Sequence, residues 1–278
     1  MPMLVGTSGW QYRDWRGVLY PPGLAERDWL AHYASRYGTV ENNGTFYRLP
    51  AAETFAAWRA KTPGGFVMTV KASRYLTHVR RLRDPAEPVG RLMRAAVGLG
   101  DRLGPVLLQL PPNLRADPGA LDACLREFAR FPGARLPGAQ LPGAQLPGAG
   151  PPGSPVRVAV ELRHESWWTP ETQQVLAAHD AALCWADRAG RPVTPLWRTA
   201  GWGYLRFHEG AAQPWPRYGV QALRSWADRT GEAWPDGADV FAYFNNDQRA
   251  AALYDAAAFA SILRRSGRQV SAAPEPGT

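Results

Sequence analysis

The chain has 278 residues, of which 45 % are hydrophobic; it is long and apolar enough to bury a full core, and these values exclude wholesale disorder. Its formal net charge is +8, and arginine supplies all but two of its 32 basic residues, the lysines being Lys61 and Lys71. A basic surface favours an anionic partner, but no long basic tract or nucleic-acid-binding motif is present, so nucleic acid is only a secondary expectation.

Short apolar runs alternate with helical patterns along the chain. The runs predict eight strands, at Met3–Thr7, Thr39–Glu41, Phe66–Lys71, Pro105–Leu110, Val156–Glu161, Ala182–Asp187, Tyr204–His208 and Asp239–Phe244. Helical periodicity predicts helices at Glu26–Tyr37, Glu53–Lys61, Pro118–Phe131, Pro170–His179, Val220–Thr230 and Gln248–Arg265. The connection between the sixth and seventh strands has no convincing helical pattern.

Eight parallel strands with intervening helices close a barrel. The predicted fold is therefore of the α/β class, a single-domain (β/α)8 TIM-type barrel over residues 1–267. An open doubly wound sheet is the alternative architecture, but the glycine-rich dinucleotide turn that usually accompanies it is absent.

One segment differs from the rest in composition. Residues 136–150 read LPGAQLPGAQLPGAG, three copies of a five-residue unit, and PPGSP follows. Such a unit is too short for a packed structural repeat. We expect residues 136–155 to be a flexible, dispensable insertion before the fifth strand, with a Pro-rich docking motif as the alternative. Residues 268–278 are expected to form a disordered tail.

Cysteine content and apolar runs bear on the cellular setting. Cys124 and Cys184 are too few for a disulfide framework or a metal knuckle, so two packed thiols are expected. The opening segment MPMLVGTSGW lacks the pattern of a signal peptide, and no window approaches about 18 apolar residues. We expect a cytoplasmic protein without a membrane partner.

Polar residues gather where the predicted strands end. Taken strand by strand, they are Ser8 and Trp10, Glu41 and Asn43, Lys71, Gln109, Glu161 and Arg163, Asp187, Arg206 and His208, and Asn245 and Asp247. In a barrel these ends form one rim, where active sites are built. A structural alternative is that the charges brace the barrel mouth, with Glu41 paired to Lys71 and Glu161 paired to Arg163 or Arg206. The number of converging polar residues favours a functional site over bracing alone.

Seven segments follow one another in a characteristic order: GTSGWQYRDWRGVLYPPGL, TVENNGTFYRLP, FVMTVKASRYLTH, GPVLLQLPP, AVELRHESWW, YLRFH and YFNND. This series resembles the YecE-like family, domain of unknown function 72, over the whole chain apart from the insertion and the tail. The resemblance implies a TIM-type barrel and no established reaction. Asn42 departs from the family, which usually has an apolar residue there, and FHEG puts the shape of the loop from Glu209 to Arg217 in question.

The first interpretation of the rim is a metal-free or metal-optional enzyme that acts on an anionic or phosphate-bearing small molecule or a nucleic-acid-derived substrate. Lys71, Arg163 and Arg206 would supply positive charge, and the glycines of GTSGW would let backbone N–H groups approach an oxyanion. Glu41 or Glu161 would be the general base and His208 its acid–base partner. Substrate contacts are expected from Ser8, Trp10, Asn43, Gln109, Arg163, Arg206, Asn245 and Asp247. No cofactor is predicted, and hydrolase, lyase and isomerase chemistry all stay open.

The second interpretation is a hydrolase or isomerase that depends on a divalent metal. Glu161, Asp187 and His208 end three successive strands, in an order that resembles the ligand set of xylose isomerase and endonuclease IV-like barrels. Such ligands would suit Mn²⁺, Zn²⁺ or Mg²⁺. However, Arg163 and Arg206 lie two residues from proposed ligands, on the same strand face, where they would neutralise the carboxylates.

The third interpretation is a non-catalytic module that binds nucleic acid or protein. The chain has twelve tryptophans, whose rings can stack on bases or sugars. Trp29, Trp58 and Trp226 fall on helical patterns and are expected in the core, whereas Trp10, Trp15, Trp167 and Trp168 follow strand ends and could line a pocket. A carbohydrate ligand would use the same rings with Glu41 and Glu161 as a carboxylate pair.

Overall fold

The computed structural model describes residues 3–133, 155–235 and 238–274, and its strands form two five-stranded sheets. The first sheet runs β1 (Met3–Thr7), β10 (Val240–Phe244), β9 (Gly203–Phe207), β7 (Trp185–Arg188) and β8 (Arg191–Pro192). The second runs β2 (Thr39–Asn42), β3 (Val67–Lys71), β4 (Leu103–Gln109), β5 (Val158–Glu161) and β6 (Ala182–Leu183). Neighbouring strands are parallel except for the β7–β8 hairpin.

The two sheets meet to form a curled, barrel-like surface. β6 pairs with β5 and β7 pairs with β9, so the single strand predicted at Ala182–Asp187 passes from one sheet to the other. At the opposite junction β1 and β2 come close, since a Cβ added at Gly6 would lie 2.4 Å from the carbonyl oxygen of Thr39. No hydrogen-bonded ladder joins β1 to β2 within the described ranges. The chain is thus a mixed α/β domain with a TIM-barrel-like sheet.

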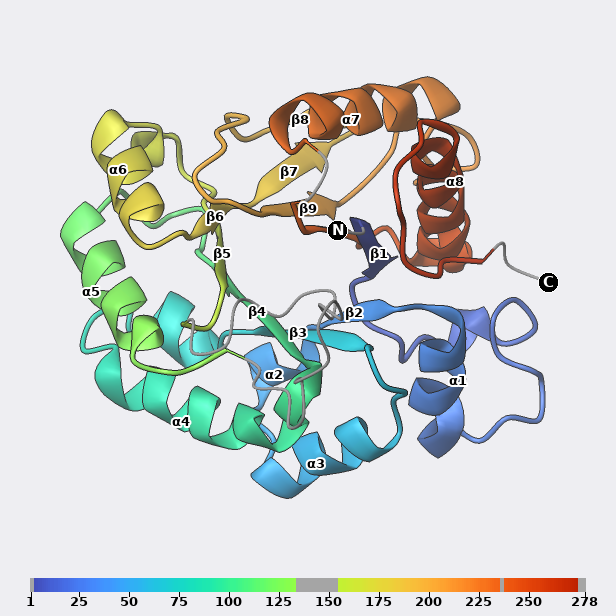
Figure 1. Ribbon diagram of the computed structural model, residues 1–278, viewed down its shortest axis with the longest axis horizontal. Helices are drawn as coiled ribbons and strands as arrows, with labels where there is room; N and C mark the ends of the chain where they lie inside the picture. Colours follow the sequence, from blue (N-terminus) through green and yellow to red (C-terminus); the bar gives the residue numbers. More distant parts are fainter. Residues whose placement is uncertain (1–2, 134–154, 236–237, 275–278) are drawn as a thin grey trace, which may run out of the picture.

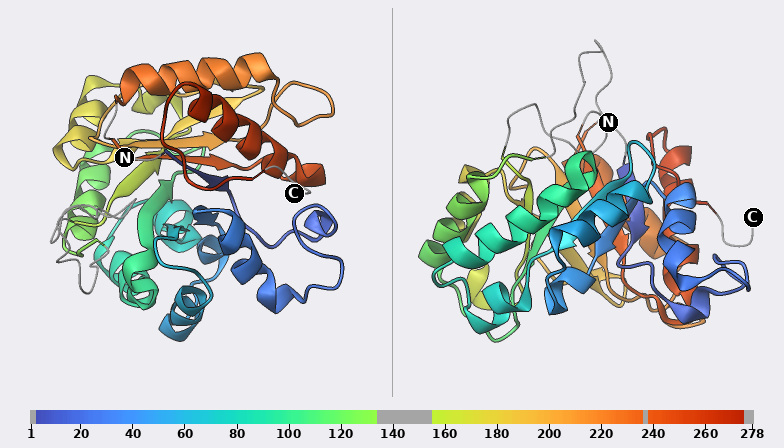
Figure 2. Two further views of the ribbon diagram at one scale, coloured as in Figure 1. Left: turned by 45° about the vertical axis from the view of Figure 1, so that its right-hand side comes forward. Right: turned by 90° about the horizontal axis from the view of Figure 1, so that it is seen from below.

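Helices surround this sheet, as Figures 1 and 2 show. They are α1 (Trp29–Arg36), α2 (Gly44–Tyr47), α3 (Ala52–Ala60), α4 (Ala86–Ala96), α5 (Pro118–Ala129), α6 (Pro170–Ala178), α7 (Val220–Ala233) and α8 (Ala251–Arg265). α5 and α6 begin with a capping side chain and a proline in the first turn, an arrangement that satisfies a free N–H group. No helix lies between β7 and β9, as predicted, but α2 and α4 were not among the predicted helices.

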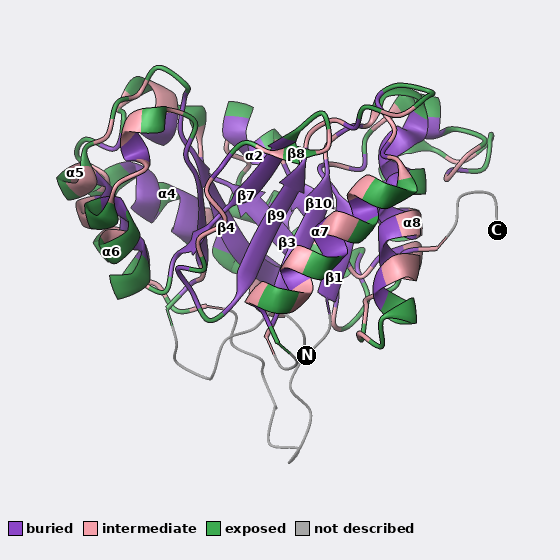
Figure 3. Cartoon of the chain, turned by 90° about the horizontal axis from the view of Figure 1, so that it is seen from above, coloured by how far each residue is buried: buried purple, intermediate pink, exposed green. Residues whose placement is uncertain are grey.

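Side chains along each strand alternate between the inside and the outside of the curled sheet, which gives an inner and an outer hydrophobic core. Leu4, Val67, Leu107, Tyr204 and Phe241 belong to a small cluster inside the curled sheet. Their strand neighbours, such as Val5 and Leu205, join the larger cluster between strands and helices. Figure 3 shows the strands in the colour of buried residues, whereas buried and exposed residues alternate along the helices. Because successive side chains point to opposite faces, the interior register also fixes which residues reach the rim.

The carboxyl-terminal segment is ordered further than predicted. Met3 N–H donates to the Gln269 carbonyl (2.8 Å) and Ser271 N–H donates to the Met3 carbonyl (2.8 Å). Ala273 is 3 % exposed. The backbone of this segment, which the sequence placed in a tail, therefore pairs with β1. Residues 136–154 of the predicted insertion and residues 275–278 lie outside the described residues.

Two smaller predictions can also be assessed. Cys124 and Cys184 are both buried free thiols, as expected. Among the described residues, no helix combines the length and apolarity needed to cross a bilayer.

Candidate functional site

A polar layer closes the interior of the barrel-like sheet at the carboxyl ends of its strands. Along each strand, the side chains that face the interior change from apolar to polar towards the carboxyl end. On β9 these side chains are Tyr204 and Arg206, and His208 follows directly after the strand. The same register brings together Ser8, Glu41, Lys71, Gln109, Glu161, Arg163, Arg206, His208 and Asn245. Most of the rim residues predicted from the sequence therefore share one cluster.

Arg206 is the centre of this cluster. Its guanidinium donates from Nη2 to Glu41 Oε1 (2.8 Å) and from Nε to both oxygens of the same carboxylate. Nη1 donates to Glu161 Oε2 at 2.6 Å. Arg206 is 2 % exposed and both carboxylates are at most 1 % exposed. One arginine from β9 thus joins carboxylates on β2 and β5.

Other donors complete the shells of the two carboxylates. Glu41 also accepts from the hydroxyls of Ser8 (2.7 Å) and Tyr204 (2.5 Å). Glu161 accepts from Gln109 Nε2 (2.8 Å) and from Arg163 Nε (2.8 Å), and Arg163 Nη2 forms an ion pair with the same carboxylate at 2.8 Å. Buried charges need such pairing, because an unpaired one costs several kcal/mol.

These contacts determine the charge state of the carboxylates. Burial alone would raise the pKa of Glu41, but Arg206 and the hydroxyls of Tyr204 and Ser8 bring it below the ordinary value. Burial likewise opposes ionisation of Glu161, yet Arg206 and its other partners hold its pKa well below the ordinary value. Both groups are therefore stable anions and weak proton acceptors.

The predicted bracing pairs are partly confirmed. Glu161 pairs with both Arg163 and Arg206, but Glu41 pairs with Arg206, so the pair with Lys71 is wrong. The reason is the interior face of β9, which presents Arg206 directly to Glu41 and satisfies that carboxylate.

Lys71 is held beside the carboxylates by the short helix α2. The Thr45 hydroxyl donates to the Lys71 carbonyl (2.7 Å) and accepts from the Lys71 N–H (3.1 Å). The ammonium lies 4.5 Å from the centre of the Phe46 ring, a favourable cation–π contact. Burial, with the nearby Arg206, lowers the pKa of Lys71 to about 8, although Glu41 and Glu161 oppose the change.

His208 lies beside Glu161 in the same cluster. Its Nε2 lies 3.3 Å from Glu161 Oε1 but finds no aligned hydrogen-bond partner in the described residues. Asn245 Nδ2 lies 3.3 Å from His208 Nδ1, an arrangement that leaves the ring proton on Nε2. Asn43 Oδ1 is a second buried atom at the rim without a partner there. An unsatisfied buried polar atom costs roughly 1–3 kcal/mol, so a donor and an acceptor are left for a ligand.

Asp187 points away from the cluster. It accepts from the Tyr218 hydroxyl (2.6 Å) and from the backbone N–H of His208 (2.7 Å). Burial raises its pKa to about 7, and these two hydrogen bonds oppose the rise. Asp187 therefore positions the chain at His208 from the outer side of the sheet.

The alternative metal ligands Glu161, Asp187 and His208 do not converge, since Glu161 binds Arg206 in the interior whereas the Asp187 carboxylate binds the Tyr218 hydroxyl. Within the described ranges, no three His, Cys, Asp or Glu side chains form a group that could hold a metal ion.

Two other predicted rim residues lie outside the charged cluster. Trp10 is 4 % exposed and packs edge-on against Trp58, with ring centres 5.8 Å apart. Asp247 lies near Tyr12 and Asp14, and burial together with Asp14 raises its pKa. Neither residue has a hydrogen bond to the charged cluster among the described contacts.

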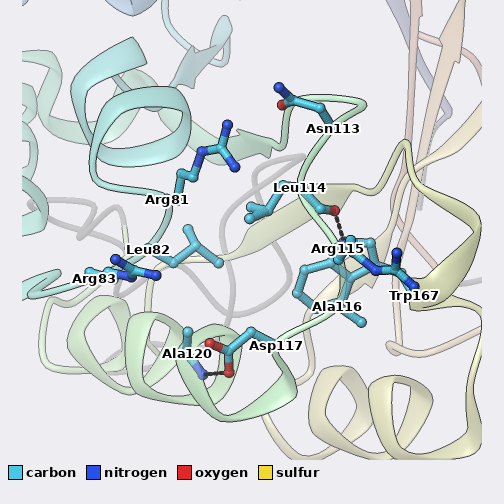
Figure 4. A pocket seen from close by; sticks show the side chains of 10 residues that line it. All are labelled: Arg81, Leu82, Arg83, Asn113, Leu114, Arg115, Ala116, Asp117, Ala120 and Trp167. Carbon is cyan, nitrogen blue, oxygen red and sulfur yellow. Dashed lines mark hydrogen bonds between the residues drawn. The ribbon is translucent and has the colours of Figure 1, made fainter.

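A second basic feature lies on loops that follow β3 and β4. A pocket of about 350 Å³ is lined by Arg81, Arg83 and Arg115, with Leu82, Leu114 and Trp167 among its apolar residues. Figure 4 shows the guanidinium groups of Arg81 and Arg115 on opposite sides of Leu82 and Leu114. No ion pair of these three arginines occurs in the described part of the chain. Trp167, which the sequence suggested as a pocket-lining residue, lines this pocket. Its arginines were missed from the sequence because they follow the strand ends by several residues.

The comparisons with known proteins agree with this architecture. The family model described as "Protein of unknown function DUF72" matches residues 4–278. The chain belongs to the DUF72 family. A DUF72 relative, UPF0759 protein YunF of Bacillus subtilis (strain 168), is 25 % identical over 276 residues, covering 87 % of this chain and 88 % of its own.

Solved DUF72 structures have the same fold. The DUF72 family protein of Thermotoga maritima MSB8 matches with a TM-score of 0.72 and 24 % identity, covering 95 % of this chain and 100 % of its own. A DUF72 family protein of Enterococcus faecalis V583 matches with a TM-score of 0.72 and 18 % identity, covering 94 % and 95 %. The family resemblance inferred from the motifs is thereby confirmed, and the chemistry has to be argued from the site.

Tyr204, Thr45 and Phe46 are site residues that the sequence analysis did not single out. Tyr204 could have been found, because it lies two residues before Arg206 and so shares its face. Thr45 and Phe46 lie on α2, a four-residue helix too short to give a periodic signal.

Proposed function

We propose that the rim of this DUF72 protein is the active site of an enzyme that binds a small anionic molecule, such as a phosphate or carboxylate compound. The proposal takes the eight strand positions as one (β/α)8-type barrel with a common rim. Lys71 and Arg163 would bind the anion, His208 would exchange protons with the substrate, and Glu41, Arg206 and Glu161 would hold these groups in place.

One observation carries the proposal. The oxygens of the two carboxylates already accept several hydrogen bonds, whereas the cations around them keep N–H groups that no carboxylate binds. Glu41 and Glu161 accept from five side chains between them within the described residues, those of Ser8, Tyr204, Arg206, Gln109 and Arg163. Arg163 is 38 % exposed at its side chain and uses Nε and Nη2 on Glu161, leaving Nη1 for a ligand. Arginine suits planar, bidentate recognition of anions.

The carboxylates are less suited to the role of general base that the sequence suggested. Their low pKa values make them weak bases, and efficient acid–base catalysis needs a pKa near the working pH. His208 suits the opposite role of donor, because its Nε2 carries the ring proton and has no aligned partner in the described structure, and the side chain is 21 % exposed.

The arginines of the second pocket add positive charge near the rim, which favours an anionic ligand there. Arg81 and Arg74 are near enough to His78, together with Lys71 and Arg163, to lower its pKa, although burial is the larger cause. Positive charge thus extends from the rim towards the pocket of Arg81, Arg83 and Arg115. Such a field raises the local concentration of anions and their rate of arrival.

A ligand screen by thermal shift tests the proposal. Phosphate, pyrophosphate, nucleotides and small carboxylic acids should raise the Tm of the wild-type protein, because a ligand that binds only the folded state stabilises it. The substitution Arg163→Gln should remove most of this increase, since it deletes the exposed cation without emptying the core.

The matched control is Arg91→Gln, which changes a surface arginine on α4 whose ion pair is with Glu87 (3.5 Å). It should leave the ligand-induced shift unchanged. The proposal of an anion site at the rim would fail if none of the four ligand classes raised the Tm of the wild-type protein. It would also fail if both variants lost the ligand-induced Tm increase to the same extent.

A further inference from the structure

Lysine is scarce in this chain, and the two lysines have different surroundings. Lys61 is exposed, and its ammonium donates to the backbone carbonyl of Arg27 at 2.8 Å. Lys71 is 8 % exposed and lies in the polar layer of the barrel-like sheet. Arginine supplies nearly all other basic residues, and it cannot lose its proton in a protein, whereas lysine can. The one amine in the site therefore has a chemical property that its cationic neighbours lack.

The setting of Lys71 is not that of a structural ion pair. Its Nζ makes no ion pair or hydrogen bond among the described residues, and its polar neighbours Glu41 and Glu161 are occupied by Arg206 and Arg163. Its backbone is fixed on both sides by Thr45, and its ammonium lies against the ring of Phe46. The amine is thus held in position while its N–H groups form no hydrogen bond or ion pair among the described residues.

These surroundings also favour the reactive form of the amine. Burial lowers the pKa of Lys71 to about 8, so roughly a tenth of the side chain is neutral at pH 7. An ordinary lysine is neutral to well under about 0.1 % at that pH. Lysines activated in this way act as nucleophiles towards carbonyl carbons.

We infer that Lys71 is a nucleophile that forms an imine with the carbonyl group of an aldehyde or ketone carrying a phosphate or carboxylate. The inference deepens the proposed function and rests on it for the anionic part of the substrate. The neutral amine adds to the carbonyl carbon, giving a carbinolamine after a proton passes from nitrogen to oxygen. The carbinolamine then loses water, since its hydroxyl takes up a proton and the nitrogen gives up its second proton as the C=N bond forms, with no change in oxidation state.

The remaining residues of the rim suit such a step. Arg163 would bind the phosphate or carboxylate through the guanidinium edge that Glu161 leaves open. His208 carries a proton on Nε2 that could assist departure of water. An imine in this site would be protonated readily, since Glu41 and Glu161 are stable anions next to it.

Pyridoxal 5′-phosphate, an aldehyde with a phosphate group, is a suitable chemical probe. The intact protein is incubated with this probe and reduced with borohydride, and the labelled lysine is identified by peptide mass spectrometry. We expect Lys71 to be labelled at least about tenfold faster than Lys61, given its larger neutral fraction. Pyridoxal without the phosphate should react more slowly at Lys71, and inorganic phosphate should protect that residue.

Two variants control the experiment. Lys61→Arg should keep the full rate of labelling, whereas Lys71→Arg should lose the fast label while keeping a wild-type circular dichroism spectrum. Labelling of Lys61 and Lys71 at equal rates, or a fast label that survives in Lys71→Arg, would overturn the inference.

The outcomes separate the inference from the proposed function. If phosphate raises the Tm of the same preparation but Lys71 reacts no faster than Lys61, the anion site stands and the imine chemistry fails. If Lys71 reacts equally fast with both aldehydes and phosphate neither protects it nor raises the Tm, the anionic substrate class fails and the reactive amine stands.

Discussion

At the scale of single residues, Asp187 shows how a side chain outside the site can control a side chain within it. Its carboxylate binds the backbone N–H of the residue that carries the candidate proton-transfer group, His208, and the hydroxyl of Tyr218 holds it on the other side. The carboxylate is 2 % exposed. Substitution at Asp187 is therefore expected to move His208 without touching a ligand.

The pH dependence of stability tests this environment. The pKa of Asp187 in the folded protein, about 7, lies above its ordinary value of 3.8, so between these pH values the folded state binds more protons than the unfolded state. The free energy of unfolding should then fall as pH rises from about 4 to 7 because of this group. The fall should be as much as about 4 kcal/mol, since one pKa unit corresponds to about 1.4 kcal/mol.

Urea unfolding of Asp187→Asn across this pH range gives the measurement. The variant cannot titrate there and should lack that part of the decline, while Asp228→Asn, an exposed change on α7, should retain it. Parallel stability curves for wild type and Asp187→Asn would mean that the hydrogen bonds from Tyr218 and His208 keep the carboxylate charged.

The site residues that the sequence could predict are those that end a strand on its inner face. Glu41, Lys71, Glu161 and Arg206 all follow from period-two alternation in runs that were already identified. Their pairing did not follow, because which carboxylate meets Arg206 depends on the curvature of two sheets that are far apart in sequence. The direction of the Asp187 side chain was also not predictable. This residue lies on the outer face of β7, because the predicted strand is interrupted between β6 and β7.

At the scale of elements, helix α4 and the carboxyl-terminal segment were the hardest to predict. α4 contains Pro88 and Gly90, which are poor helix formers. Pro88 nevertheless lies in the first turn, where a missing N–H group costs little. The terminal segment has small, polar residues typical of disorder, but its order comes from backbone hydrogen bonds to Met3 and to Gly38, which carry no sequence signal.

Truncation tests the contribution of this segment. Removal of residues 269–278 deletes three backbone hydrogen bonds, from Met3 to Gln269, from Ser271 to Met3 and from Gly38 to Ala272. At about 1 kcal/mol each, their loss should lower the Tm by roughly 5–10 °C in a domain of this size. Scanning calorimetry measures the change.

The matched control is removal of residues 275–278 alone, which should leave the Tm close to that of the full chain. An unchanged Tm after the longer truncation would show that β1 does not need its carboxyl-terminal neighbour.

At the scale of the whole molecule, the polar layer joins the two sheets. Arg206 and Tyr204 come from the sheet of β1 and β9, whereas Glu41 and Glu161 come from the sheet of β2 and β5. A second link lies deeper, where the Tyr243 hydroxyl bonds those of Thr39 (2.7 Å) and Thr69 (2.9 Å). The sequence predicted a closed barrel from the strand count, but the links that hold its halves together appear only in three dimensions.

Removing the central cation tests this role. Arg206→Met keeps much of the side-chain volume but leaves two buried carboxylates without their main partner. Breaking one side of a buried ion pair typically costs about 3–5 kcal/mol, and urea unfolding should show a loss of at least that size.

The triple variant Arg206→Met, Glu41→Gln and Glu161→Gln provides the control, because neutral side chains no longer need the guanidinium. It should recover a large part of the lost stability. A loss below about 1 kcal/mol in the single variant would contradict the role assigned to Arg206.

The bridging position of Arg206 has a consequence for folding. Neither sheet alone contains the whole polar layer, since Arg206 lies on one sheet and its partners Glu41 and Glu161 lie on the other. A half-folded species could therefore hold native-like strands yet fail to recognise any substrate. Ligand binding during refolding would then measure the docking of the two sheets. Measurements of strand burial or helix content would not detect that step separately.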